Sequence, residues 1–119
     1  MYEIYIYEDI NGKSEVLNYF ELLQKSSNKN DRIKAKKIRM YMILLKEYGL
    51  KLNEPYIKHI DKDLWELRPL KDRFLFAYLY ENKFIILSHF IKKTQKTPKY
   101  EIEKAKILFE EYKNRSDFK

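Results

Sequence analysis

The stretch 64–93, LWELRPLKDRFLFAYLYENKFIILSHFIKK, contains three apolar runs in which side chains alternate with a period of two. Leu64–Leu70, Arg73–Glu81 and Phe84–Lys93 are therefore predicted to be strands. The middles of the last two runs are apolar on both faces, which is typical of central strands covered on both sides. Asn82-Lys83 fits a two-residue hairpin loop, because Asn tolerates positive φ.

Two helices are predicted before this stretch and one after it. Ser14 is a plausible N-cap for a short first helix. A longer helix runs from about Arg32 to Tyr48, and Gly49 supplies its C-terminal stop. The last helix opens with Thr97 as N-cap and Pro98 at its first helical position.

Two further strands complete the predicted sheet. Tyr2–Tyr7 alternates apolar and polar side chains, and Tyr56–Ile60 is a weaker candidate. The predicted order is strand, two helices, four strands and a helix. This order indicates an α+β fold with a mainly antiparallel sheet, two N-terminal helices and one C-terminal helix. A length of 119 residues fits one domain, residues 1–119.

The chain is basic, with 25 Lys and Arg against 18 Asp and Glu and a formal charge of +7. This balance favours a polyanionic partner such as RNA, DNA or an acidic protein. The absence of cysteine excludes disulfides, thiolate nucleophiles and Cys-based zinc sites. No secretory signal and no apolar run of about 20 residues is present, so we expect a cytoplasmic protein without a membrane segment.

Positive charge concentrates in the predicted helical pair. Eight basic residues and one acidic residue, Asp31, lie between Lys25 and Lys46. The polar face of this pair is therefore predicted to be strongly positive.

The strongest candidate chemistry lies on the first strands of the opening stretch. The period of two places Glu66 and Arg68 on one strand face, opposite Trp65 and Leu67. Arg73 begins the next strand, so a tight hairpin would bring both guanidinium groups to one end of the sheet. The alternative is a half-buried strand whose solvent face carries a Glu/Arg pair without a functional role.

A second basic element follows the last strand. Lys92, Lys93, Lys96 and Lys99 lie at a strand-to-helix junction, where free backbone N–H groups also favour anions. A solvated loop is the alternative. The position of this junction beside two strand arginines favours a phosphate-binding groove.

The chain has two histidines, His59 and His89. They could form an acid–base pair, but unrelated positions are the more common arrangement. His89 alternates with Leu87 and Ile91 on an apolar strand face, which predicts a partly buried packing role.

Three segments resemble the signature of HigB-type toxins, the phage-related Gp49-like branch of the RelE/ParE superfamily. They are Leu64-Trp65-Glu66-Leu67-Arg68, Arg73 with Tyr78, and the run His89–Pro98 that contains Lys-Lys-Thr-Gln-Lys-Thr-Pro. The similarity covers roughly residues 2–113. It implies a RelE-like fold.

The resemblance also implies an activity and partners. Members of this family are ribosome-dependent endoribonucleases that cleave translated mRNA through attack of the ribose 2′-hydroxyl on the adjacent phosphate, without a metal or other cofactor. A helix-turn-helix antitoxin of the HigA type neutralises each toxin. The complex, expected to be a heterotetramer, binds operator DNA through the antitoxin.

Four residues carry the implied catalytic roles. Arg73 matches the arginine that stabilises the phosphate, and Lys93 matches the basic position at the end of the last strand. Glu66 matches a position used in proton transfer, and Arg68 would support the phosphate or keep Glu66 ionised. Several relatives carry Arg or His at the position of Lys93, and a Lys is a compact point charge that donates a proton poorly, so the general acid is open.

The expected substrate-binding residues are Phe90, Lys92, Lys96, Lys99 and Tyr100. Tyr100 matches a C-terminal tyrosine of some relatives only with a one-residue gap. Two other functions stay open: a ParE-like inhibitor of DNA gyrase, and a non-catalytic module that binds RNA or protein.

Overall fold

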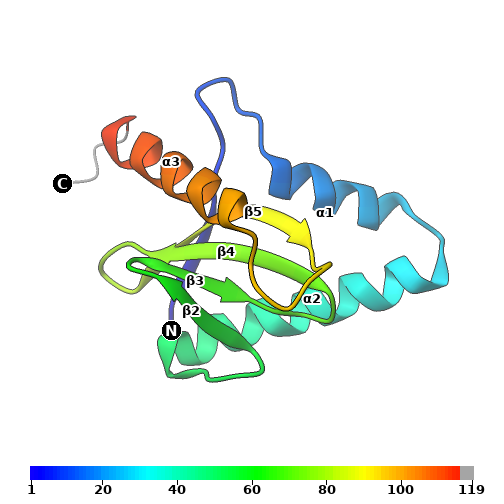
Figure 1. Cartoon of the computed structure of the whole chain (residues 1–119). Helices are drawn as coiled ribbons and strands as arrows, with labels where there is room; N and C mark the ends of the chain where they lie inside the picture. The colour runs from blue at the N-terminus through cyan, green and yellow to red at the C-terminus, as the bar shows by residue number, and fades with distance from the viewer. Residues whose placement is uncertain (116–119) are drawn as a thin grey trace.

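The computed structural model describes residues 1–115, so positions 116–119 of the predicted domain lie outside the described part. Three helices and five strands form an α+β fold, which confirms the predicted class (Figure 1). The elements are β1 (Glu3–Ile6), α1 (Glu15–Lys25), α2 (Lys29–Tyr48), the 3-10 turn η1 (Gly49–Lys51), β2 (Ile57–Asp61), β3 (Leu64–Leu67), β4 (Asp72–Tyr78), β5 (Lys83–Ile91) and α3 (Lys99–Arg115).

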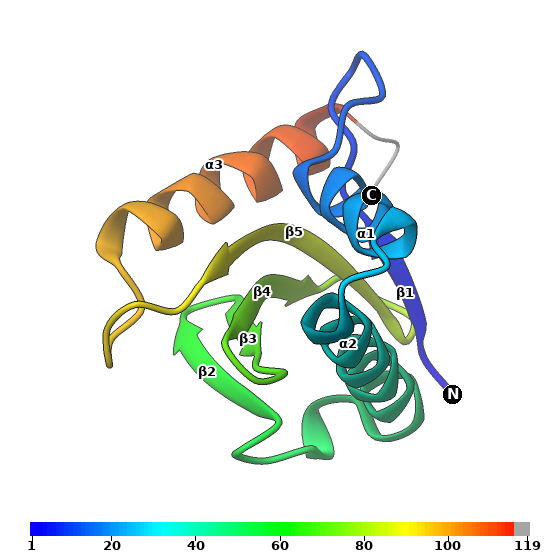
Figure 2. The same ribbon diagram turned by 90° about the vertical axis from the view of Figure 1, so that its right-hand side faces the viewer.

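The five strands form one mixed sheet in the order β1-β5-β4-β3-β2. Strand β1 pairs in parallel with β5, and the other neighbours are antiparallel. Helices α1 and α2 cover one face of the sheet and α3 covers the other (Figure 2). Among the described residues, no helix is both long and apolar enough to cross a membrane.

The central strands contribute apolar side chains to two separate layers. Phe74 and Phe76 pack against α1 and α2, whereas Leu75 and Ala77 pack against α3. All four side chains are fully buried, and each buried Phe or Leu contributes on the order of 2 kcal/mol. The two-sided apolar pattern of the sequence is thus confirmed.

The helix ends follow from local capping. The Ser14 hydroxyl accepts a hydrogen bond from the Leu17 amide at 3.1 Å, as predicted. Helix α2 begins at Lys29, three residues earlier than predicted, because the Asn28 side chain accepts from the first free amides of the helix. Gly49 ends α2 with φ 59°, and a Cβ atom there would collide with the Tyr2 ring.

Two turn assignments differ from the prediction. The positive φ values of the β4–β5 loop belong to Glu81 and Asn82, one position before the predicted Asn82-Lys83. Thr97 was predicted to cap the last helix, but its hydroxyl donates to Glu66 at 2.7 Å. The Pro98 carbonyl accepts the first helical hydrogen bonds instead.

A β-bulge changes the expected orientation of His89. Leu75 pairs with Ser88 and Phe76 pairs with Ile86, so Leu87 is the extra residue on β5. Leu87 consequently packs in the α3 layer, while His89 stacks on Tyr19 in the other layer. The prediction that Leu87 and His89 share one face is wrong because strict alternation fails at a bulge.

Candidate functional site

The end of the sheet where β3 passes into β4 carries a buried carboxylate on each face. Glu66 on β3 lies on the α3 side, and its side chain is 2% exposed. Asp72 at the start of β4 lies on the α1–α2 side and is fully buried. A buried carboxylate is costly unless it is paired, so the partners of each one define its role.

Glu66 gathers the two predicted arginines. Its Oε1 lies 3.3 Å from Arg68 Nε and 3.8 Å from Arg73 Nε, and its Oε2 accepts the hydroxyl of Thr97. The prediction that a tight hairpin brings both guanidinium groups together is confirmed. The alternative of a solvent-facing Glu/Arg pair does not hold for Glu66, because Thr97 and the two arginines cover it.

Arg73 is held rigidly by the backbone. Its Nη1 donates to the carbonyls of Leu70 at 2.8 Å and of Asp72 at 2.9 Å. Burial lowers the pKa of Arg73, as does the charge of Arg68, while Glu66 acts in the opposite direction. The guanidinium is still a cation at neutral pH, and its side chain is only 7% exposed.

Segment 92–98 links β5 to α3 and borders this cluster. The Lys92 amide donates to the Lys71 carbonyl at 2.8 Å, which fixes the start of the segment beside the β3–β4 connection. Lys93 and Lys96 are exposed, and Lys92 is half-buried. Thr97 is the residue of the segment that reaches Glu66.

The remaining predicted site residues lie at different depths. Phe90 pairs directly with Arg73 across the β4–β5 ladder and packs in the α3 layer. Lys99 and Tyr100 are exposed in the first turn of α3, Tyr100 at 71%. Within residues 1–115, no hydrogen bond or ion pair joins Lys93, Lys96, Lys99 or Tyr100 to Glu66, Arg68 or Arg73.

Asp72 organises a second cluster that sequence reasoning missed. Its Oδ1 accepts the Tyr19 hydroxyl at 2.6 Å and lies 2.8 Å from His89 Nε2 and 3.9 Å from Lys34 Nζ. Burial alone raises the pKa of Asp72, but these hydrogen bonds and cationic charges outweigh burial and lower it. Burial and the hydrogen bond to Asp72 raise the pKa of Tyr19.

The packing role predicted for His89 is confirmed. Its ring stacks on Tyr19 with centroids 3.9 Å apart, and it also contacts Phe74. His59 instead packs on Trp65 and lies 2.8 Å from the Lys62 carbonyl. The two histidines thus have separate partners. Among residues 1–115, no group of three or more His, Asp or Glu side chains is arranged to hold a metal ion.

Residues 28–110 match the family model described as Phage derived protein Gp49-like (DUF891). The match begins just before α2 and includes β2 to β5 and most of α3, so it contains the Glu66 cluster and segment 92–98. None of the curated proteins compared with the sequence matches it.

Proposed function

Because the chain belongs to the Gp49-like family of phage-derived proteins, a family of RelE- and HigB-like toxins, we propose that it is a ribosome-dependent endoribonuclease. The family indicates a toxin of a toxin–antitoxin system. The proposed reaction is cleavage of translated mRNA by the ribose 2′-hydroxyl, with no metal, and the whole chain acts as one toxin domain.

The observation that carries the proposal is the pair of guanidinium groups on Glu66. Attack by the 2′-hydroxyl places extra negative charge on a crowded phosphorane, and preorganised cations stabilise such charge best. Arg73 is held by two carbonyls and therefore needs little reorganisation. Arg68 is the more open of the two, with 18% of its side chain exposed.

Glu66 is the proposed proton acceptor. Its carboxylate has to reach the 2′-hydroxyl within hydrogen-bond distance, and only 2% of the side chain is exposed. Acceptance of the proton therefore requires the Thr97 hydroxyl to leave Glu66 and segment 92–98 to move. While the Thr97 hydroxyl donates to Glu66, the carboxylate neutralises and orients the two arginines.

The lysines in and next to segment 92–98 suit binding of the RNA backbone. Lys92, Lys96 and Lys99 would contact phosphates, and such contacts weaken with salt. Lys93 would stabilise charge at the departing oxygen as a point charge. The exposed Tyr100 ring suits stacking on a base, and Phe90 supports Arg73 from the neighbouring strand.

A translating extract tests this function. The purified chain is added, and mRNA ends are mapped by primer extension beside naked mRNA. We expect codon-phased cuts only when ribosomes are present. Arg73→Ala should lower the rate about a hundredfold, equivalent to about 3 kcal/mol of transition-state stabilisation.

Arg115→Ala is the matched control, because Arg115 lies at the far end of α3 and pairs with Glu111. It should cut like the wild type. Intact mRNA together with loss of supercoiling in a gyrase assay would replace the proposal with a ParE-like activity. Salt-sensitive RNA binding without cleavage would replace it with a binding module.

A further inference from the structure

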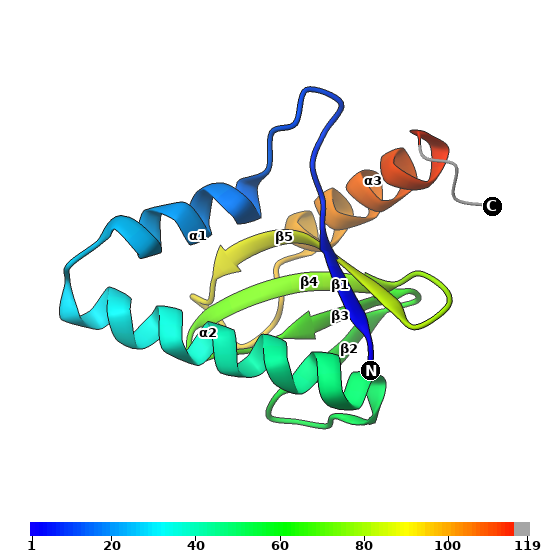
Figure 3. The ribbon, with the colours of Figure 1, turned by 180° about the vertical axis from the view of Figure 1, so that it is seen from behind.

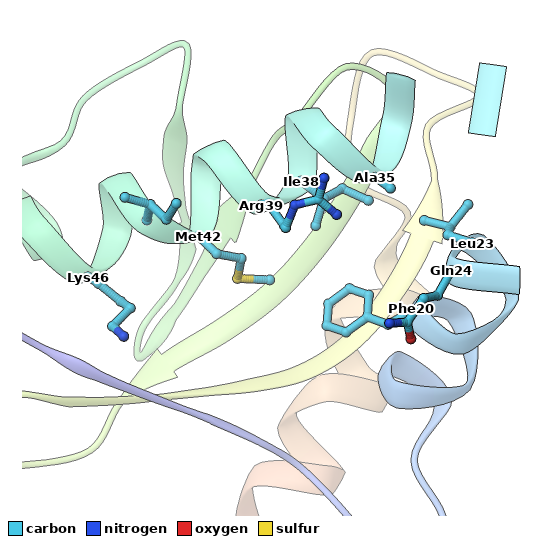
Figure 4. Close-up of a pocket in the computed structure, with 9 residues that line it drawn as sticks. Phe20, Leu23, Gln24, Ala35, Ile38, Arg39, Met42 and Lys46 are labelled. Carbon is cyan, nitrogen blue, oxygen red and sulfur yellow. The ribbon is translucent and has the colours of Figure 1, made fainter. Parts of the chain in front are cut away.

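Helices α1 and α2 diverge from their connecting turn (Figure 3), and side chains of both helices line a groove. The groove has a volume of about 370 Å³. The close-up shows side chains from both helices bordering it (Figure 4). The lining residues are Phe20, Leu23, Gln24, Ala35, Ile38, Arg39, Met42, Ile43 and Lys46. We call this feature the α1–α2 groove.

The floor of the α1–α2 groove is apolar. Leu23 and Ile38 belong to the buried core, and Phe20 and Met42 pack partly against it. Ile43 at the rim is 58% exposed. An apolar surface of this kind gains stability when an apolar partner removes it from water.

The rim of the groove is cationic. Arg39 and Lys46 line the α1–α2 groove itself, and Lys29, Arg32 and Lys36 line an adjoining hollow toward the helix turn. No acidic residue lines either hollow. In the part of the chain that the structure describes, none of these five cations forms an ion pair. The ion pairs of this part involve other basic residues, such as Lys25, Lys34, Lys104 and Lys106.

Four of the five basic residues of α3 are arranged differently. Lys104, Lys106, Lys113 and Arg115 each pair with a carboxylate of the same chain. The five cations beside the α1–α2 groove and its adjoining hollow are therefore available to the carboxylates of a partner.

We propose that the α1–α2 groove binds an amphipathic helix of the antitoxin, with large apolar side chains on the floor and Asp or Glu residues against the cationic rim. The α2 stripe from Ala35 to Lys46 extends about 16 Å, or about three helical turns. A helix of that length laid in an apolar groove is a common recognition mode. RNA suits the rim but fits the floor less well, because Phe20 is the single aromatic side chain among the lining residues on which a base could stack. The identity of the partner as an antitoxin rests on the proposed function.

The probe is the helix-turn-helix antitoxin that the proposed function implies, titrated calorimetrically into the full chain. Arg39→Glu and Lys46→Glu reverse exposed charges and should leave folding unchanged. Met42→Glu places a charge on the floor. Each variant should weaken binding about tenfold or more. Lys58→Glu is the control, because Lys58 is exposed on β2, away from the groove, and should bind within about twofold of the wild type.

Cleavage of mRNA by the same variants is measured separately, which distinguishes the two proposals. If no preparation cleaves mRNA but the groove variants still bind more weakly than the wild type, the nuclease function is overturned and the groove assignment stands. Unchanged binding by all three groove variants would overturn the groove. So would the absence of binding to the wild type, or a loss of binding confined to Arg68→Glu and Lys93→Glu, which would place the antitoxin on the Glu66 side.

Discussion

Glu66 and Asp72 are buried carboxylates at the same end of one sheet, yet they are held in different ways. Asp72 accepts a short hydrogen bond from Tyr19 and lies at hydrogen-bond distance from His89, with Lys34 nearby. Glu66 accepts one hydrogen bond, from Thr97, and lies near two guanidinium groups.

Each cluster also contains one buried polar atom without a hydrogen-bond partner, Asp72 Oδ2 in one and Arg68 Nε in the other. The Arg68 Nε atom is buried and has no hydrogen-bond partner, although it lies 3.3 Å from Glu66. The two clusters differ in exposure, since 18% of the Arg68 side chain is exposed, whereas the Asp72 and His89 side chains are 0% and 8% exposed. The Asp72 cluster thus links α1, α2 and the sheet, whereas the proposed role of the Glu66 cluster is to receive a competing anion.

Replacing each carboxylate by its neutral amide should distinguish a structural role from a functional one. Asp72→Asn should lower the free energy of unfolding by about 3 kcal/mol, because it breaks a buried charge cluster. Glu66→Gln should lower it by about 2 kcal/mol, because Arg73 keeps its two carbonyl acceptors. Urea denaturation of both variants measures the difference.

The same pair sharpens the functional comparison. Glu66→Gln should abolish most of the mRNA cleavage of the folded protein, while folded Asp72→Asn should retain it. Equal stability losses, or a cleavage defect in Asp72→Asn alone, would reverse the roles assigned to the two carboxylates.

The contribution of Asp72 to stability should depend on pH. The folded pKa of Asp72 is lowered from 3.8, so the unfolded chain binds the proton more readily. This contribution to stability is complete above the unfolded pKa and is lost as pH falls through the folded pKa. Tyr19, Lys34 and His89 are the groups that face the carboxylate.

The free energy of unfolding measured between pH 5 and pH 2.5 should therefore fall more steeply for the wild type than for Asp72→Asn. A wild-type slope that survives this substitution unchanged would assign the acid sensitivity to other carboxylates.

The smallest effect is expected at Thr97. Thr97→Val removes the hydrogen bond to Glu66 without changing the size of the side chain, and should cost about 1 kcal/mol. Hydrogen exchange of the amides in segment 92–98 should become faster. Thr94→Val is the matched control, since Thr94 donates to the Lys96 carbonyl on the exposed surface. Equal exchange in both variants would show that Thr97 does not hold the segment.

Sequence periodicity was sufficient to predict the helices, the strands and the two apolar faces of the central strands. The apolar alternation of β4 and β5 predicted both faces of the core, and Ser14 and Gly49 marked helix ends correctly. These features depend on neighbours within a few residues, which is why a single sequence reveals them. The bulge at Leu87 was missed, because one extra residue leaves no mark in an unbroken apolar run.

The candidate site was predictable only in part. The short connection between Arg68 and Arg73 predicted that the two side chains meet, and the structure confirms it. The partners of Asp72 come from three other elements, so no local pattern signals its cluster. The Thr97 hydroxyl was assigned to a cap because the Thr-Pro pair is compatible with one; tertiary proximity to Glu66 decided otherwise.

The parallel pairing of β1 with β5 has a consequence for the order of folding during synthesis. Glu3 pairs with Lys83, so the first strand to be made waits for the last strand before it gains its hydrogen-bonded neighbour. Such distant contacts delay folding, because a long loop must close before they form. Arg73 and Thr97 are also made late, and α3 follows them. The sheet, the basic cluster and the outer layer can therefore be complete together only after α3 has been synthesised.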